Sequence, residues 1–124
     1  MQIPILKQGE YLVATVQAAF TDADLRQFQT DIVVQVGKHR SRGVIIDVSA
    51  MDVVDSFGTR VLQSVAHMVQ LRGAHAVIVG IQPDVAFSMV QLGLRFEGVA
   101  TLLDLEDGLA FLHRQMKEGS RHGP

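Results

Sequence analysis

The chain has 124 residues, a formal charge of −2 and no cysteine, and this length favours a single domain that buries about two-thirds of its unfolded surface. The absence of cysteine excludes disulfides, thiolate catalysis and cysteine-ligated metals. The slightly acidic charge balance argues against nucleic acid as the main partner, because binding to phosphates needs a basic face.

The first predicted elements are two short extended segments, residues 3–6 and 11–16, on either side of a turn at residues 8–10. They indicate a β-hairpin, or one strand with a preceding arm. Thr21 and Asp22 can then cap a helix that ends near Gly37. Its apolar residues recur at spacings of three and four: Leu25, Phe28, Ile32 and Val36. The basic residues that follow suit the negative end of the helix dipole: Lys38, His39, Arg40 and Arg42.

A buried strand is predicted at residues 44–48, because its nearly unbroken run of branched side chains is typical of a central parallel strand. A helix follows from Ser56 to about Arg72. Its apolar stripe contains Val61, Leu62, Val65, Met68 and Val69. After a second buried strand at residues 76–80, Pro83 suits the first turn of the next helix, and Gly93 suits its end. That helix carries Val85, Met89 and Leu92.

The last elements are a short strand at residues 99–103 and a helix that Asp104 caps, with Asp107 three residues further on. The apolar residues of this helix are Leu105, Leu109, Leu112 and Met116. From Gly119 the sequence has no apolar periodicity, so we expect a domain at residues 1–118 and a disordered tail at residues 119–124.

Strands that alternate with helices at this spacing predict an α/β fold with a mixed, mostly parallel sheet and about four helices. The N-terminal strand or hairpin supplies the antiparallel part. Binding chemistry in such folds concentrates beyond the carboxyl ends of the strands. Residues 49–56 follow a central strand directly, so we expect the functional site there.

The motif Asp55-Ser56-Phe57-Gly58 stands at this position. The Ser56 hydroxyl can act as a helix cap, or it can accept a phosphoryl group. Asp55 would repel such a phosphate, whereas Arg60, one helical turn further on, could pair with it. The Phe57 ring is either an apolar anchor for a partner or an inward-pointing core residue, and Gly58 leaves room for a second backbone.

Enzyme functions find little support in the sequence. The chain has no glycine-rich phosphate loop, its histidines lack a zinc-binding spacing, and Ser56 has neither a nucleophile elbow nor a local base. Asp47, Asp52 and Asp55 could together hold Mg²⁺ in a phosphatase, but loop aspartates also bond readily to nearby backbone. We therefore expect no catalysis, no metal and no cofactor.

Residues 55–59, the preceding strand at residues 44–48 and the turn Gly80-Ile81-Gln82-Pro83 together resemble the STAS domain of anti-sigma factor antagonists. Within that family the chain is most similar to the RsbS-type scaffold proteins of the bacterial stressosome. Residues 3–7, 43–57 and 103–109 also carry this resemblance, which extends over nearly the whole chain apart from the tail.

The resemblance implies a phosphorylation-controlled scaffold without catalytic activity. Ser56 would be phosphorylated by an RsbT-type protein kinase, with Thr59 as a minor candidate, and a PP2C-type phosphatase would reset it. The unphosphorylated chain, as a homodimer and in a large hetero-oligomer with RsbR-type STAS paralogues, would hold the kinase captive. Asp55, Phe57, Gly58 and Arg60 would flank the switch.

Other functions remain open at this point. Sporulation antagonists carry the motif Asp-Ser-Ser-Gly, whereas in this chain Phe57 stands in place of the second serine. A function as an antagonist that binds an anti-sigma kinase directly nevertheless remains an alternative to the scaffold function. A module of a different class would bind a small molecule or nucleotide with residues 49–55. No apolar run reaches the ~18 residues of a membrane span, and residues 1–4 do not resemble a signal peptide, so we expect a cytoplasmic protein without membrane or nucleic-acid partners.

Overall fold

The computed structural model describes residues 3–17, 21–52 and 54–121. These residues form one five-stranded sheet in the order β1-β2-β3-β4-β5. The strands are β1 (Ile5–Gln8), β2 (Tyr11–Thr15), β3 (Gly43–Asp47), β4 (His75–Val79) and β5 (Ala100–Leu102). The helices in the described part of the chain are α1 (Asp22–His39), α2 (Ser56–Leu71), α3 (Pro83–Gln91) and α4 (Leu105–Arg121).

The sheet is mixed, as predicted. Strands β1 and β2 pair antiparallel with Leu6 opposite Val13, which makes them a hairpin and excludes the single strand with an arm. Gly9 has a φ of +61° in the hairpin turn, a conformation that glycine adopts without steric cost. The pairings of β2 with β3, β3 with β4 and β4 with β5 are all parallel.

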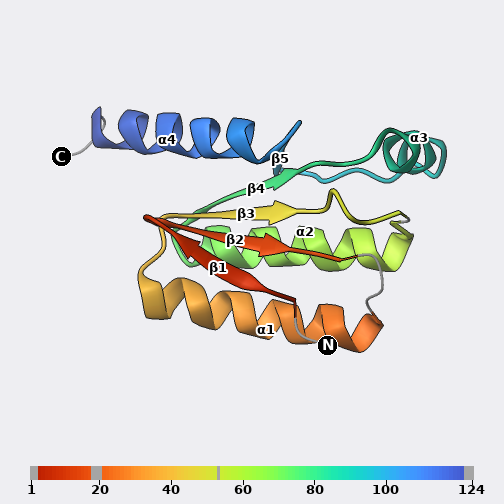
Figure 1. Ribbon diagram of the computed structural model, residues 1–124, viewed down its shortest axis with the longest axis horizontal. Helices are drawn as coiled ribbons and strands as arrows, with labels where there is room; N and C mark the ends of the chain where they lie inside the picture. The colour runs from red at the N-terminus through yellow and green to blue at the C-terminus, as the bar shows by residue number, and fades with distance from the viewer. Residues whose placement is uncertain (1–2, 18–20, 53, 122–124) are drawn as a thin grey trace.

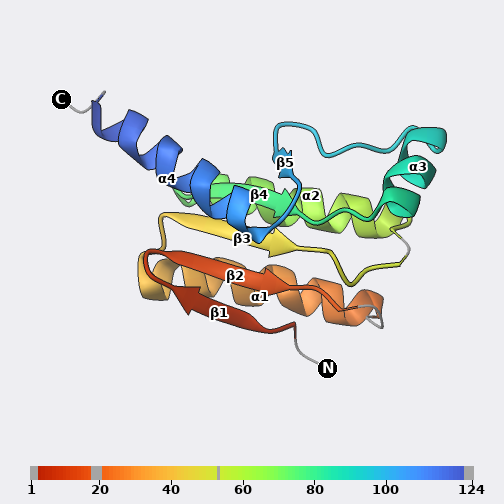
Figure 2. The same cartoon turned by 45° about the horizontal axis from the view of Figure 1, so that its top comes forward.

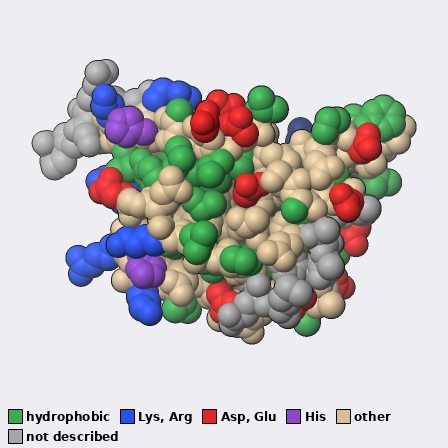
Figure 3. Space-filling model, viewed as in Figure 1, with side chains coloured by type: hydrophobic (Ala, Val, Ile, Leu, Met, Phe, Trp, Pro, Cys, Tyr) green, Lys and Arg blue, Asp and Glu red, His purple; other side chains and the backbone are tan. Residues whose placement is uncertain are grey.

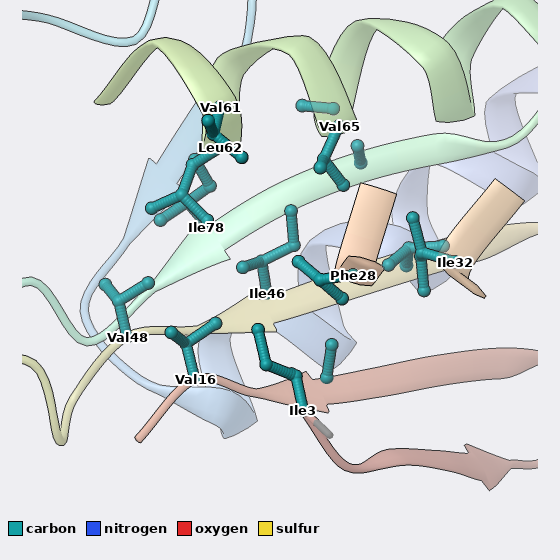
Figure 4. Packing of buried hydrophobic residues seen from close by; sticks show 14 of the residues in the cluster. Ile3, Val16, Phe28, Ile32, Ile46, Val48, Val61, Leu62, Val65 and Ile78 are labelled. Atoms are coloured by element: carbon teal, nitrogen blue, oxygen red, sulfur yellow. The ribbon is translucent and has the colours of Figure 1, made fainter. Parts of the chain in front are cut away.

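Helices cover the two faces of the sheet unequally. Figures 1 and 2 show α1 and α2 side by side on one face, whereas α4 lies on the other. The larger core lies beneath α1 and α2, and its labelled members in Figure 4 include Phe28, Ile46 and Leu62. A smaller core beneath α4 contains Val13, Ile45, Val77, Val79 and Leu112. Neighbouring residues of β3 thus enter different cores, because side chains of a strand alternate between its faces.

Some apolar surface remains uncovered. Leu6 pairs with Val13 and therefore shares the α4 face of the sheet, yet it is 65% exposed. Figure 3 shows hydrophobic side chains gathered below α4 on this side of the molecule. A sheet covered by helices on both faces thus coexists with an exposed apolar surface. None of the helices within the described ranges is long and apolar enough to cross a membrane.

Three element ends differ from the sequence prediction. Helix α1 runs two residues past Gly37 and stops where Arg40 takes a left-handed φ of 48°. Leu92 is 67% exposed, because α3 ends at Gln91 and the chain turns at Gly93, where φ is +71°. Helix α4 continues through Arg121, past the predicted boundary at residue 118, since each added residue contributes a hydrogen bond without needing an apolar stripe. Residues 122–124 of the predicted tail lie outside the described residues.

Candidate functional site

The candidate site lies at the carboxyl ends of β3 and β4, where two loops are tied together. Asp47 ends β3, and its carboxylate accepts hydrogen bonds from the Ser49 backbone N–H at 2.9 Å and the Ser49 hydroxyl at 2.6 Å. The Gln82 side chain, just before α3, donates to the Ser49 carbonyl oxygen. A β-carbon on Gly80 would lie 2.8 Å from the Ser49 β-carbon, so only glycine allows this close approach. The loop that leads to α2 is therefore held in place from two strands.

Asp55, rather than Ser56, caps α2. Its backbone is extended, and its carboxylate accepts a hydrogen bond of 2.7 Å from the Gly58 backbone N–H. The interpretation of Ser56 as the cap is therefore wrong: Ser56 is the first residue inside the helix. It is exposed, and its hydroxyl forms no hydrogen bond with any residue of the described ranges. The hydroxyl thus stands free at the surface with no structural role in the helix start.

The Phe57 ring combines the two roles that the sequence left open. It is half-buried and packs against the larger core, so it is partly a core residue. Its exposed side lies under the guanidinium of Arg26, whose central carbon is 5.6 Å from the ring centroid. Arg26 belongs to α1. It could not be identified as a residue of the site from the sequence, because no local pattern shows that α1 meets α2 at this point.

Gly58 and Thr59 both face inward. Gly58 is buried, and a β-carbon there would lie 3.2 Å from the Asp55 carboxylate, so the cap rather than a partner's backbone occupies the space. Thr59 is 4% exposed and its hydroxyl donates to the Asp55 carbonyl oxygen at 2.9 Å. This is the expected bond back to the helix backbone, and it leaves the hydroxyl inaccessible to another protein in this conformation.

Arg60 is exposed one turn after Ser56, on the same side of α2. The charged side chains around Ser56 are Asp55, which is negative, and Arg26 and Arg60, which are positive. A phosphate on Ser56 would meet charges of both signs. The site therefore has an accessible hydroxyl with one carboxylate beside it and two guanidiniums nearby.

The alternative in which three aspartates hold Mg²⁺ finds no support among the described residues. The Asp47 carboxylate is bonded to Ser49 and that of Asp55 to the helix start, while Asp52 is exposed in the loop between them. Within the described ranges, no three acidic or histidine side chains gather in a way that could hold a metal ion. The plainer interpretation of these aspartates, as turn and cap residues, is confirmed for Asp47 and Asp55.

Two cavities of the structure lie away from the loop that a small-molecule module would use. One of about 410 Å³ lies between residues 3–5, at the start of β1, and α1, and its lining includes Ile3 and Asp31. The other, of about 280 Å³, lies between α3 and β5, and its lining includes Met89 and Phe96. Neither is lined by a residue of segment 49–55.

The sequence profile of the STAS domain matches residues 2–107, so the chain belongs to the STAS domain family. Its structure is similar to that of a serine-to-glutamate variant of RsbS from Moorella thermoacetica, with a TM-score of 0.80 and 35% identity over 93% of this chain and 97% of that one. It is also similar to a chain in the solved molecular architecture of the stressosome, described as a signal integration and transduction hub. There the TM-score is 0.74 and the identity 34%, over 91% of this chain and 98% of that one.

Among curated relatives, the RsbT co-antagonist protein RsbRA of Bacillus subtilis (strain 168) is 35% identical over 74 residues. This match covers 60% of the present chain but only 27% of that protein, so the chain corresponds to about a quarter of its relative's length. The predicted resemblance is confirmed: the chain is an RsbS- and RsbR-like STAS domain with the fold of anti-sigma factor antagonists.

Proposed function

We propose that this chain is a non-catalytic switch and scaffold of a stressosome-type complex, which holds an RsbT-type protein kinase until Ser56 is phosphorylated. One observation carries the proposal: the Ser56 hydroxyl is exposed and forms no hydrogen bond with the described residues, because the neighbouring Asp55 carboxylate already caps α2. A protein kinase needs such a hydroxyl on an accessible segment. The similarity to RsbS over nearly the whole chain supports the assignment to this kind of complex.

The switch would act by electrostatics. The unmodified surface around Ser56 carries the Asp55 carboxylate, the Arg26 and Arg60 guanidiniums and a partly exposed ring, Phe57. A phosphoserine adds about two negative charges next to Asp55. Inside a closed interface these charges repel acidic groups and lose their hydration, so a docked kinase dissociates. The backbone of α2 needs no rearrangement, because the modified side chain has no structural role to lose.

The similarity to RsbR-type proteins supports one further partner, and the phosphatase is part of the proposal. RsbRA is an RsbT co-antagonist, and we propose that this chain co-assembles with RsbR-type STAS paralogues around the same kinase. A PP2C-type phosphatase would return Ser56 to the binding-competent form. The exposed apolar side chains are available for assembly contacts, among them Leu6, Leu71, Phe87, Val90 and Leu103.

A binding titration with an RsbT-type kinase tests the proposal. We expect Ser56→Ala to bind like the unphosphorylated wild type and Ser56→Asp to bind at least about tenfold more weakly, which corresponds to about 1.4 kcal/mol. Ser88→Asp is the matched control, because Ser88 is exposed and receives the same added charge on a different helix, α3. Equal affinities of the alanine and aspartate variants at Ser56 would refute the switch.

The alternative function, that of a direct anti-sigma factor antagonist, differs from the scaffold function in the kinase that the chain binds. A pull-down that offers the chain both an RsbT-type kinase and an anti-sigma kinase should recover the first alone. Recovery of the anti-sigma kinase instead would replace the scaffold with the antagonist and leave Ser56 as the switch residue.

A further inference from the structure

Arg26 reaches the motif from a different helix. Helices α1 and α2 lie side by side on one face of the sheet (Figure 1), and the Arg26 guanidinium carbon is 5.6 Å from the centroid of the Phe57 ring. Phe57 follows Ser56 directly, and the α-carbons of consecutive residues are about 3.8 Å apart. The flexible Arg26 side chain could therefore reach a phosphate on Ser56.

The Arg26 guanidinium is available for a new partner. It is exposed, and it takes part in no ion pair within the described ranges, where the salt bridge found is Arg95 with Glu97. Its contact with Phe57 is a cation–π interaction at a solvent-exposed site, which is weak. A guanidinium forms shorter and stronger bonds with a phosphate, often two in parallel. A nearby phosphate would therefore draw Arg26 away from the ring.

The cap at the start of α2 limits what the helix can offer a phosphate. The Asp55 carboxylate already occupies the Gly58 backbone N–H, and its negative charge opposes a second anion. A cationic side chain would therefore add stabilisation that the capped helix start does not supply. Arg60, one turn further along α2, is the local candidate, and Arg26 is the candidate from α1.

We infer that Arg26 and the Phe57 ring form a two-position site, in which the guanidinium covers the ring before phosphorylation and binds the Ser56 phosphate afterwards. The inference rests on the proposed function only in taking Ser56 as the residue that carries the phosphate. Phosphorylation then changes two properties of the docking surface at once. It adds negative charge, and it uncovers the outer side of an aromatic ring beside that charge.

The test uses the full chain with phosphoserine installed at position 56 during translation, so that no kinase has to recognise it. A ³¹P NMR titration measures the second pKa of the phosphate in the wild type and in Arg26→Gln, Arg60→Gln and Arg114→Gln. Arg114 is exposed on α4, which lies on the opposite face of the sheet from α2, and it serves as the control. We expect Arg26→Gln to raise the phosphate pKa by about half a unit, because a nearby cation favours the dianion. We expect Arg114→Gln to leave it unchanged.

A second readout follows the ring contact itself. In the unphosphorylated protein the side-chain protons of Arg26 should show upfield ring-current shifts, which Phe57→Leu removes. Phosphorylation should remove these shifts as well. Unchanged Arg26 shifts after phosphorylation, or a phosphate pKa that responds only to Arg60→Gln, would overturn the inference. Either result would leave the proposed function standing, because that depends on kinase binding and not on which arginine holds the phosphate.

Discussion

The starts of α1 and α2 use a hydroxyl-bearing residue in opposite ways. At α1 the Thr21 hydroxyl accepts a hydrogen bond from the Asp24 backbone N–H at 3.1 Å, and the Asp24 carboxylate accepts one from the Thr21 backbone N–H at 3.0 Å. This reciprocal pair is a capping box. At α2 the Asp55 carboxylate does the capping, and the Ser56 hydroxyl one residue later is left without a partner in the described ranges.

This difference separates a structural hydroxyl from an available one. Thr21 lies outside its helix, where a side-chain oxygen can reach the free N–H groups of the first turn. Ser56 lies inside its helix and is exposed, and its hydroxyl bonds to none of those groups within the described ranges. Stability therefore does not explain Ser56, and its explanation has to come from what binds or modifies it. Mutations at the two helix starts test this separation.

The largest effect is expected at Asp55. Asp55→Ala removes the acceptor for the Gly58 N–H, and loss of such a cap lowers the free energy of unfolding by about 1–2 kcal/mol. Urea denaturation measures this loss. Asp52→Ala is the matched control, because Asp52 is an exposed loop aspartate for which we expect a change within about 0.5 kcal/mol. Similar losses for both variants would mean that the Asp55 cap contributes nothing specific.

A somewhat smaller loss is expected at Thr21. Thr21→Ala removes the hydroxyl of the capping box and should lower the free energy of unfolding by about 1 kcal/mol. Thr21→Ser retains the hydroxyl and should recover most of that loss, since serine is an equally good cap. The prediction fails if the serine variant is as unstable as the alanine variant.

The capping box also predicts a weak pH dependence. The hydrogen bond from the Thr21 backbone N–H holds the pKa of Asp24 below its usual value. The folded state therefore favours the charged carboxylate, and this contribution is present above the usual pKa of about 3.9 and is lost as the pH falls through the lowered value. The stability difference between the wild type and Asp24→Asn should shrink below about pH 4. A difference that stays constant into acid would contradict the assignment.

The smallest effect is expected at Ser56 itself. Ser56→Ala should change the free energy of unfolding by no more than about 0.5 kcal/mol, because the hydroxyl has no hydrogen-bond partner among residues 3–17, 21–52 and 54–121. Parallel denaturation of Ser56→Ala and Thr21→Ala sharpens the comparison of the two helix starts. If both lost the same amount of stability, Ser56 would be a structural residue and the argument for an available hydroxyl would collapse.

The order of the elements could be predicted from the sequence, because periodicity and end signals are local properties. The nearly unbroken apolar run of β3 and the caps Thr21 and Asp104 all appear where the sequence placed them. Helix ends were harder to predict where the regular spacing of apolar residues continues beyond the last turn of the helix. Leu92 continues the spacing of α3, but the turn at Gly93 leaves it in solvent.

Two features of the candidate site could not be derived from the sequence. Aspartate and serine are equally favoured as caps, so the pair Asp55-Ser56 does not say which residue ends up inside the helix. That choice depends on the loop that Ser49 and Gln82 hold in place. The contact of Arg26 with Phe57 depends on how α1 packs against α2, and neither residue's own neighbours in sequence reveal it.

The most direct test of the account is to incubate the chain with an RsbT-type kinase and MgATP and to locate the phosphate by mass spectrometry. We predict one phosphate per chain, on Ser56, and none in Ser56→Ala. Phosphate on another residue, or undiminished labelling of the alanine variant, would show that the free hydroxyl at the start of α2 is not the one the kinase modifies.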